Sequence, residues 1–340
     1  MKLARLVAVA VALALAGGPV AAQRLPVQVD LPVVPALEPA LPVLVAEAAG
    51  HFRGEGVEVG RFLLTGGVSI RNLLIGGRAS FGVLGTEHIP LARTAGSPLK
   101  AVASVYDRLH VTLIVRSALR GQVKSVQDLR GRTVGVTAPG SFTWSVAVTF
   151  LKRAGLEPDR DVRLLPVGTD AHVLYAALQT GRVDALVFSE PVLSRAEMDG
   201  VGFVLVDVFD PVVARRWIGS DLLLVGVLAS TESAIQAQPE VAGALVRAIA
   251  RGLAYLRSHG AEEIVRLVAG NPKTSQLLQG VPRELAVRMV NRIRRGFGTG
   301  CLSPTGYQAE LRRMMETGVL RQPVSFEEAT DARWAGVCPR

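Results

Sequence analysis

The sequence is poor in cysteine and in aromatic residues, and both shortages limit what the protein can be. Its 340 residues include two cysteines, so a paired-cysteine metal motif or a cysteine-bound iron cluster is excluded. Aromatic side chains make up 5% of the chain and the basic residues are spread along it, which argues against a nucleic-acid-binding surface. We therefore expect no metal, no cofactor and no nucleic-acid partner.

Long apolar runs are also scarce, and the clearest one lies at the N-terminus. Lys2 and Arg5 precede the apolar residues 6–16, and small residues follow up to Ala22. This run is shorter than the roughly 20 residues that span a bilayer, and the whole segment is typical of an export signal. We expect residues 1–22 to be cleaved and the mature protein to be periplasmic. No cysteine follows the run, so no lipid anchor is expected.

The mature chain keeps an excess of basic residues. Removal of Lys2 and Arg5 lowers the formal net charge from +9 to about +7. This excess fits an anionic ligand or surface, but a solubility feature is the more ordinary explanation, and composition leaves both interpretations open. Cys301 and Cys338 lie in the last segment, and in an oxidising compartment such a pair favours a disulfide over a redox or metal site.

Apolar strand-like runs alternate with helical periodicity, the pattern of α/β units around a mainly parallel sheet, and the length suffices for two domains. Strands are expected over residues 27–31, 57–63, 79–84, 100–105, 111–115, 133–136, 162–166, 185–188, 203–206 and 222–228. Helices are expected over residues 42–52, 68–75, 142–154, 171–179 and 239–257. After residue 230 the pattern is almost wholly helical, and we expect this tail to pack on one lobe without chemistry of its own.

Two segments repeat one pattern and predict two lobes built in the same way. Residues 77–86 and 181–190 each contain a glycine, a turn, a short buried strand, and small or polar residues at the carboxyl end of the strand. Ligands of open α/β sheets gather outside the carboxyl ends of strands. Two groups are therefore expected to face one another across a shared cleft: Gly85, Thr86 and Glu87 from one lobe, and Ser189 and Glu190 from the other.

Further segments match a known family in their order and spacing: residues 42–59, 65–74, 85–87, 128–136, 139–141 and 181–191. In these segments the chain resembles the periplasmic solute-binding proteins of ABC importers for nitrate, sulfonates, taurine and thiamine precursors, which share an SsuA/THI5-like domain. The resemblance extends over roughly residues 27–260.

This resemblance implies an α/β type II periplasmic-binding-protein fold, with two α/β lobes joined by two crossover segments and a ligand cleft between them. We place the first lobe at residues 24–112 plus 225–340 and the second at 113–224. The crossovers are expected near residues 110–115 and 221–227. Two long connections favour a hinge, so that closure buries a small ligand against both lobes.

A helix start at residues 139–143 is the first candidate contact with that ligand. Gly140 lets the backbone approach a ligand closely, and Ser141 is a good N-cap. The backbone N–H groups of Phe142 and Thr143 can then donate to the oxygens of a carboxylate, sulfonate, nitrate or phosphate. A plain capped helix end with water at its tip would have the same sequence.

Other candidates lie in the remaining loops of the expected cleft. A second set of backbone donors is expected at Gly66, Gly67, Val68 and Ser69, although a plain turn would look the same. Glu87 and Glu190 can receive an ammonium or amide group, or can be solvated or paired with an arginine. The first loop, residues 35–39 with Leu37 and Glu38, is less polar than the family's usual loops and indicates a partly apolar solute.

Three further side chains near these loops have ordinary explanations. Tyr106 and Trp144 can line the pocket or pack in the core, and the sequence does not decide between these roles. His88 has no metal-ligating partner at a useful spacing and is not expected to bind a metal.

Catalytic motifs are absent from the sequence. It has no Gly-x-Ser-x-Gly elbow, phosphate-binding loop or His-Glu-x-x-His motif, so we do not expect an enzyme. Pyrimidine synthases of the related fold use a cysteine-rich iron motif that is missing here, and the futalosine-pathway enzymes of this fold are cytosolic, which the export signal contradicts.

The expected function is therefore solute binding for an ABC importer. A monomeric protein would capture a small anionic or zwitterionic organic solute, such as a sulfonate, taurine, nitrate or a pyrimidine precursor, and deliver it to a membrane permease. The receptor of a TRAP-type transporter and a ligand-binding sensor protein are the alternatives, and an enzyme on the same fold is a more distant one.

Overall fold

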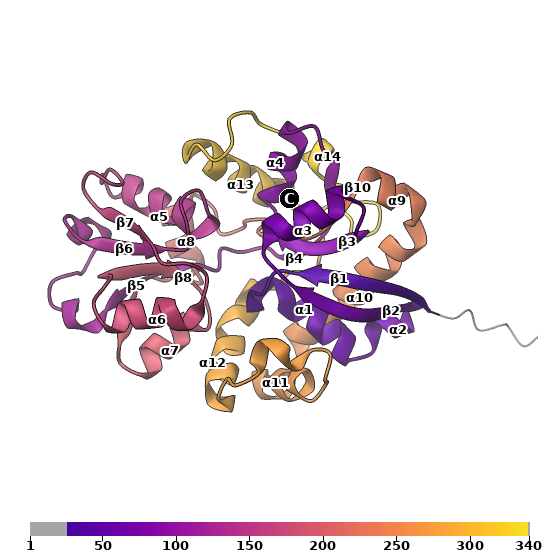
Figure 1. Ribbon diagram of the computed structural model, residues 1–340, viewed down its shortest axis with the longest axis horizontal. Helices are drawn as coiled ribbons and strands as arrows, with labels where there is room; N and C mark the ends of the chain where they lie inside the picture. Colours follow the sequence, from indigo (N-terminus) through magenta and orange to yellow (C-terminus); the bar gives the residue numbers. More distant parts are fainter. Residues whose placement is uncertain (1–25, 339–340) are drawn as a thin grey trace, which may run out of the picture.

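The computed structural model describes residues 26–338, and its strands form two separate five-stranded sheets (Figure 1). The first sheet has the order β2-β1-β3-β10-β4 and the second the order β7-β6-β8-β5-β9. The strands are β1 (Val27–Val33), β2 (Val57–Leu64), β3 (Phe81–Gly85), β4 (Leu99–Tyr106), β5 (Thr112–Arg116), β6 (Thr133–Val136), β7 (Arg163–Pro166), β8 (Ala185–Phe188), β9 (Gly202–Val206) and β10 (Gly226–Thr231). The expected export signal, residues 1–22, lies outside the described residues.

The two sheets have the same topology, which agrees with the repeated sequence pattern. In each sheet four strands run in one direction, and β10 in the first and β5 in the second run against both of their neighbours. The reversed strand is the one that the chain forms on entering a lobe from the other. The carboxyl ends of the remaining strands in both sheets therefore lie at the edge where the chain crosses between lobes.

Helices cover the faces of both sheets (Figure 1). They are α1 (Leu37–Ala48), α2 (His51–Gly54), α3 (Gly67–Ile75), α4 (His88–Thr94), α5 (Phe142–Arg153), α6 (Ala171–Gln179), α7 (Val192–Met198), α8 (Pro211–Ile218), α9 (Glu232–Ala237), α10 (Pro239–Ser258), α11 (Ala261–Ala269), α12 (Arg283–Ile293), α13 (Pro304–Glu316) and α14 (Phe326–Ala329), with short 3-10 turns η1 (Ser117–Leu119), η2 (Val126–Leu129), η3 (Ser275–Leu278) and η4 (Arg294–Gly296). Within residues 26–338, no helix combines the length and the apolarity needed to cross a membrane.

The start of the first helix corrects one expectation. Leu37 and Glu38, expected in a loop, form the first turn of α1, and both are buried. Pro39 falls in that first turn, where its missing N–H has no intrahelical acceptor to lose. Pro42 lies farther inside, where the helix continues without one backbone bond. The sequence analysis began this helix at Pro42, but tertiary burial of residues 37–41 extends it back to Leu37.

The return crossover corrects a second expectation. The strand expected over residues 222–228 begins at Gly226, and residues 222–225 belong to the crossover. Two backbone hydrogen bonds join them to the first crossover: Leu223 donates to the Asp107 carbonyl (2.9 Å) and Val225 to the Tyr106 carbonyl (3.1 Å). The two crossovers, residues 107–111 and 219–225, thus run side by side.

The helical tail also differs from expectation, because it packs on both lobes. Helix α12 contacts α7 and helix α13 contacts α5, both of which belong to the second lobe. In Figure 1 these two tail helices lie on either side of the crossovers. Ala309 of α13 is part of the hydrophobic core of the second lobe. The tail therefore contributes side chains to the interlobe region.

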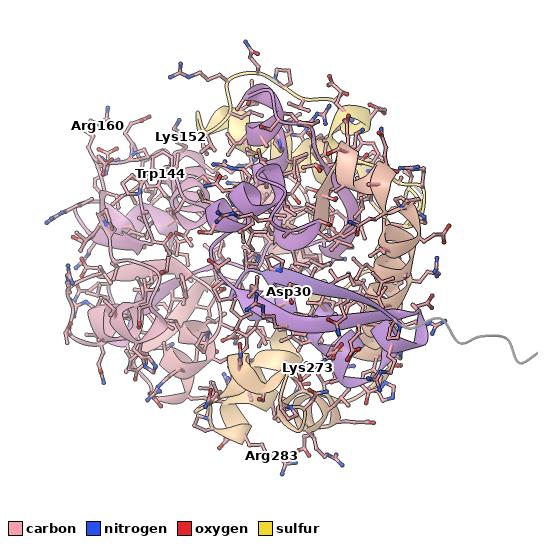
Figure 2. The ribbon with its side chains drawn as sticks, turned by 45° about the vertical axis from the view of Figure 1, so that its right-hand side comes forward. Asp30, Trp144, Lys152, Arg160, Lys273 and Arg283 are labelled. Atoms are coloured by element: carbon pink, nitrogen blue, oxygen red, sulfur yellow. A yellow bond between two sulfur atoms is a disulfide. The ribbon has the colours of Figure 1, made fainter. Side chains whose placement is uncertain are left out.

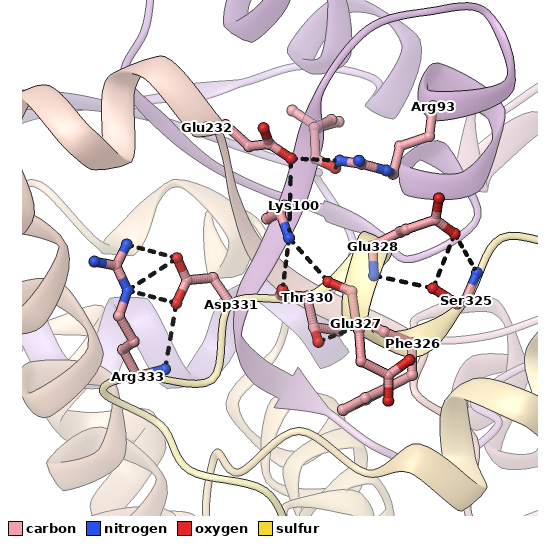
Figure 3. A network of polar contacts seen from close by, with 11 residues as sticks. Arg93, Lys100, Glu232, Ser325, Phe326, Glu327, Glu328, Thr330, Asp331 and Arg333 are labelled. Atoms are coloured by element: carbon pink, nitrogen blue, oxygen red, sulfur yellow. Dashed lines mark hydrogen bonds and ion pairs between the residues drawn. The ribbon is translucent and has the colours of Figure 1, made fainter.

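The end of the tail is hydrogen-bonded to the edge strand of the first sheet (Figure 3). Thr330 forms a parallel bridge with Ala101 of β4, and Lys100 donates to the carbonyls of Glu327 (2.9 Å) and Thr330 (3.1 Å). Cys301 and Cys338 form a disulfide. Because β4 is an edge strand, this segment covers backbone groups that would otherwise be open to pairing. The disulfide closes a loop that contains α13 and α14.

Candidate functional site

The candidate site lies between the lobes, where loops from both sheets meet. In the first lobe α1, Gly66 and Thr86 follow the carboxyl ends of β1, β2 and β3. In the second lobe the segments containing Ser141 and Ser189 follow β6 and β8. This arrangement is the one in which open α/β sheets bind ligands.

One direct contact joins the two lobes at these loops. The backbone N–H of Glu190 donates to Oε1 of Glu38 at 3.4 Å. Both carboxyl side chains are buried. The first turn of α1 therefore touches the loop after β8.

Three rings, those of Tyr106, His110 and Phe142, pack against one another at the first crossover. The His110 ring lies edge-on to Tyr106 with centroids 5.8 Å apart, and it stacks on Phe142 at 5.4 Å and an interplanar angle of 12°. The Tyr106 hydroxyl donates to the Ile293 carbonyl. The sequence did not decide whether Tyr106 packs in the core or lines the pocket. In the structure Tyr106 is buried and its hydroxyl has a hydrogen-bond partner.

The tail supplies an arginine to the same region. The Arg313 guanidinium of α13 lies 4.8 Å from the Phe142 ring centroid, donates to the Ser145 hydroxyl and pairs with Glu310. Its side chain is buried. Both charges of the Arg313–Glu310 pair are thus compensated inside the protein.

A third group of residues lies at the start of α4. Glu87 Oε1 lies 3.6 Å from Nε2 of His88. A Cβ atom at Gly67 would lie 2.2 Å from this same Nε2, and a Cβ atom at Gly85 would lie 2.2 Å from a carboxylate oxygen of Glu87. The two glycines therefore provide the space that the His88 and Glu87 side chains occupy.

Four buried polar atoms around the interlobe region have no hydrogen-bond partner among the described residues: Oε2 of Glu38, Oγ1 of Thr86, Nδ1 of His88 and Nδ1 of His110. Buried polar groups are normally paired, because leaving one unpaired costs roughly 1–3 kcal/mol. The four atoms come from α1, from the loop after β3, from α4 and from the first crossover. Each of these atoms can therefore still form a hydrogen bond with a solute or with water.

The ionisable members of this set are uncharged near neutral pH. Burial raises the pKa of Glu38 to about 8, and the nearby Glu190 carboxylate adds to the shift. Burial lowers the pKa of His88 to about 4, with a further contribution from Arg71, and burial alone lowers that of His110 to about 4. Burial also raises the pKa of Glu87. A buried anionic group of a solute would find little compensating charge here.

Glu190, a predicted ligand contact, is largely occupied by protein groups. Its carboxylate accepts from the Ser194 backbone N–H at 3.0 Å and from the Ser194 hydroxyl at 2.7 Å, and it lies 3.6 Å from Nη1 of Arg292. Arg292 also pairs with Glu197 of α7. This carboxylate therefore fixes α12 against α7 and has limited capacity left for a solute.

The predicted helix start at Ser141 is formed. Ser141 is the N-cap of α5, and its hydroxyl accepts from the Trp144 N–H at 3.2 Å and from the Thr137 hydroxyl at 2.8 Å. Gly140 has a φ of 71°, which favours glycine, and it is exposed. Among the described residues, no protein acceptor receives the N–H groups of Phe142 or Thr143.

Several predicted residues lie outside this buried set. Gly66, Val68 and Ser69 are exposed at the start of α3, and Leu37 packs in the core of the first lobe. Ser189 is buried beside Glu190. Trp144 is half-buried at the margin of the second core.

One cavity opens between the lobes beside this region. Its volume is about 160 Å³, and it is lined by the starts of α6 and α7 and by residues 279–285 of the tail. Pro191 and Val192, which directly follow Glu190, belong to its wall. It is smaller than the roughly 300–1,000 Å³ of typical small-molecule pockets.

The interlobe geometry can be compared with that of known proteins. The chain belongs to the NMT1/THI5 like family. The family's sequence profile matches residues 39–263. The chain is 26% identical over 304 residues to the riboflavin-binding protein RibY of Chloroflexus aurantiacus, with 85% of this chain and 80% of that protein covered.

Solved structures of this type are similar over almost the whole chain. A protein of Bordetella bronchiseptica RB50 is 26% identical with a TM-score of 0.73, covering 91% of this chain and 95% of that one. The alkanesulfonate-binding protein SsuA of Xanthomonas axonopodis pv. citri, bound to MOPS, is 18% identical with a TM-score of 0.69, covering 90% and 99%. The NMT1/THI5 like chain therefore has the expected type II periplasmic-binding-protein fold, with two mixed sheets.

Sequence reasoning missed the residues that the tail and the crossover contribute. His110 was seen as part of a connection, and Arg292 and Arg313 as part of an outer layer. One signal was available in α13, where Glu310 and Arg313 occupy the same buried face as Tyr307 and Met314. A charged pair on an apolar helix face indicates a buried ion pair.

Several basic residues lie outside the candidate site. Lys152 and Arg160 of the second lobe and Arg283 of the first are exposed and lie at the periphery in Figure 2. No group of three or more metal-ligating side chains is found within residues 26–338.

Proposed function

We propose that this protein is the extracytoplasmic solute-binding component of an ABC importer, which captures a small organic solute between its lobes and delivers it to a membrane permease. The observation that carries the proposal is the set of four buried, unpartnered polar atoms in α1, the loop after β3, α4 and the first crossover. Membership of the NMT1/THI5 like family supports it. The solute would be released unchanged.

Entry of a solute requires the lobes to separate. The cavity between them has a volume of about 160 Å³, which is too small for most organic solutes. The paired crossovers, residues 107–111 and 219–225, can bend as a hinge. Closure then buries the solute against both lobes, and opening at the permease releases it.

The buried part of the solute is uncharged in our proposal. Glu38, His88 and His110 are neutral at neutral pH, and the buried charges of Arg313 and Glu310 compensate each other. A neutral group with hydrogen-bond donors and acceptors can satisfy the unpartnered atoms. A buried anion would need a free positive charge in the same place.

An anionic end of the solute can bind at the start of α5. The exposed Gly140 and the N–H groups of Phe142 and Thr143 form a backbone donor site, which the helix dipole favours by about 0.3–1 kcal/mol. Such a solute has one anionic and one neutral end. Relatives support organic solutes of both kinds: RibY is a riboflavin-binding protein and SsuA an alkanesulfonate-binding protein.

A thermal-shift screen tests the proposal. The panel contains riboflavin, flavin mononucleotide, pyrimidines, taurine, alkyl and aryl sulfonates, nitrate, dicarboxylates and amino acids. A solute at 100 times its Kd stabilises the folded protein by about 2.7 kcal/mol. Native mass spectrometry then shows whether the bound molecule is recovered unchanged. Turnover of the molecule, or no response to any member of the panel, would contradict the proposal.

Comparison of riboflavin with flavin mononucleotide tests the anionic end separately, because the two differ by one phosphate. Gly140→Val strains a backbone with φ of 71° and should remove the added affinity of the phosphorylated probe. Gly140→Asn is the control, because asparagine tolerates this conformation. An unchanged preference for the phosphate in Gly140→Val would show that α5 does not bind the anion.

A further inference from the structure

Glu38 has an unusual position for a glutamate. It lies in the first turn of α1 and is completely buried, with 0% of its surface exposed. Its Oε1 accepts from the Glu190 backbone N–H at 3.4 Å, and its Oε2 has no hydrogen-bond partner among the described residues. The neighbouring Ser189 side chain favours the charged form of this carboxyl, but burial has the larger effect and raises its pKa. Within residues 26–338 no lysine, arginine or histidine forms an ion pair with it.

The surroundings of Glu38 disfavour a negative charge. The neighbouring group on the second lobe is another carboxyl, that of Glu190. Arg292 and Ser194 stabilise the charge of Glu190, since Nη1 of Arg292 lies 3.6 Å from it and Ser194 donates twice. Two adjacent buried carboxyls with one cation are expected to hold one proton, and the geometry assigns that proton to Glu38.

The other titratable groups near Glu38 do not reverse this assignment. Tyr106 of β4 is buried, and burial raises its pKa further above the ordinary value, so it stays neutral. Burial raises the pKa of Glu190 as well, and Glu197 of α7 adds to this shift, but the hydrogen bonds from Ser194 and the charge of Arg292 oppose it. In the described part of the chain, Glu38 has no such cation. Burial raises the pKa of Glu38 itself to about 8.

We propose that Glu38 is a neutral carboxylic acid that determines solute specificity, donating a hydrogen bond from Oε2 to an uncharged acceptor such as a carbonyl oxygen or a ring nitrogen of the solute. The inference rests on the proposed function, because it requires the solute to lie between the lobes. An anionic oxygen could also accept this bond, but it would lie beside the carboxylate of Glu190, and the repulsion selects a neutral acceptor. Ionisation of Glu38 removes the donor.

Infrared difference spectroscopy on the intact chain tests the protonation without any solute. We expect an absorption of the protonated carboxyl C=O at neutral pH that Glu38→Gln removes. Glu47→Gln is the matched control, because Glu47 lies on the same helix and pairs with Lys273 as a carboxylate (3.4 Å). A spectrum that Glu38→Gln leaves unchanged would overturn the proposal.

Binding of riboflavin between about pH 6 and pH 9 tests the donor role. Wild-type affinity should fall at least about tenfold as the pH rises through about 8, the value at which Glu38 loses its proton. Glu38→Gln, whose amide keeps a donor and cannot ionise, should bind riboflavin at every pH, and Glu38→Ala should bind weakly throughout. The same fall with pH in Glu38→Gln would overturn the donor role.

The outcomes separate this inference from the proposed function. If riboflavin gives no thermal shift with the wild-type chain, the titration uses the pyrimidine that gives the largest shift. If no member of the panel binds, the proposed function and the donor role are both contradicted, while the infrared result still decides the protonation of Glu38. If a solute binds and both Glu38 variants bind it like the wild type, the inference fails and the function stands.

Discussion

The guanidinium of Arg313 lies 4.8 Å from the ring centroid of Phe142, although the two residues are far apart in the sequence. Arg313 belongs to the C-terminal tail, and Phe142 is the first residue of α5 in the second lobe. The bridge between Thr330 and Ala101 holds the tail on β4 of the first lobe, and the disulfide joins the end of the tail to Cys301 before α13. The contact therefore connects the two lobes beside the crossovers.

We predict that Arg313→Met destabilises the protein strongly. The substitution leaves Glu310 buried without its cation, which costs about 3–5 kcal/mol of the free energy of unfolding. Urea denaturation measures this loss. The exposed neighbour supplies the control: Arg312→Met should change stability by less than about 0.5 kcal/mol.

A double substitution then separates the lost pair from the unpaired charge. Arg313→Met combined with Glu310→Leu removes both charges and should recover most of the stability, because apolar replacements of a buried ion pair are often neutral. If the double variant is as unstable as the single one, packing against Phe142 matters more than the charge of Glu310.

A second tail arginine should control the docking of α12 on α7. Arg292→Met removes the cation beside the buried Glu190, and we expect a loss of about 1.5–3 kcal/mol together with faster amide hydrogen exchange in α7. Arg288→Met is the matched control, because Arg288 is exposed and Glu197 keeps Arg292 as its partner. Equal exchange in the two variants would contradict the role of Arg292.

The sequence predicted the elements whose signals are local. The strands at 133–136 and 185–188 and the helix at 171–179 have the predicted bounds, because their apolar runs, helical periodicity and flanking glycines lie in or next to these segments. The cap at Ser141 was predicted for the same reason. Each of these features depends on a few neighbouring residues.

The features that the sequence did not predict depend on residues far apart in the chain. Helix α1 begins at Leu37 despite two prolines, because burial against the sheet outweighs the local signal. Arg292 and Arg313 reach the second lobe because the tail passes beside the crossovers, and no spacing in the sequence encodes that path. The contacts that these two arginines make in the candidate site therefore could not be predicted from the sequence.

A pair of adjacent glycines offers a sharp test of the candidate site. Gly67→Ala places a methyl group where the Nε2 atom of His88 lies 2.2 Å away, so the imidazole must move. We expect a loss of about 1–3 kcal/mol and a weaker thermal shift with the bound panel member. Gly66→Ala is the control, because no atom lies within 4 Å of its new methyl group. An unchanged thermal shift in Gly67→Ala would remove His88 from the site.

The buried imidazole of His110 predicts how stability depends on pH. Burial lowers its pKa to about 4, whereas an unfolded histidine titrates near 6.5. Between these values the unfolded chain binds more protons than the folded one, so the stabilisation is complete above about pH 6.5 and is lost as the pH falls towards 4. The contribution is on the order of 3 kcal/mol, at about 1.4 kcal/mol for each pKa unit. His110→Phe should keep the stack on Phe142, and it should reduce the difference in bound protons between the unfolded and folded states by about one in this pH range.

Urea denaturation at pH values across the interval measures how steeply the free energy of unfolding depends on pH, and the exposed His172→Gln should leave this slope unchanged. A slope that His110→Phe does not alter would show that other groups cause the acid instability, with His88 as the next candidate because burial lowers its pKa to the same value.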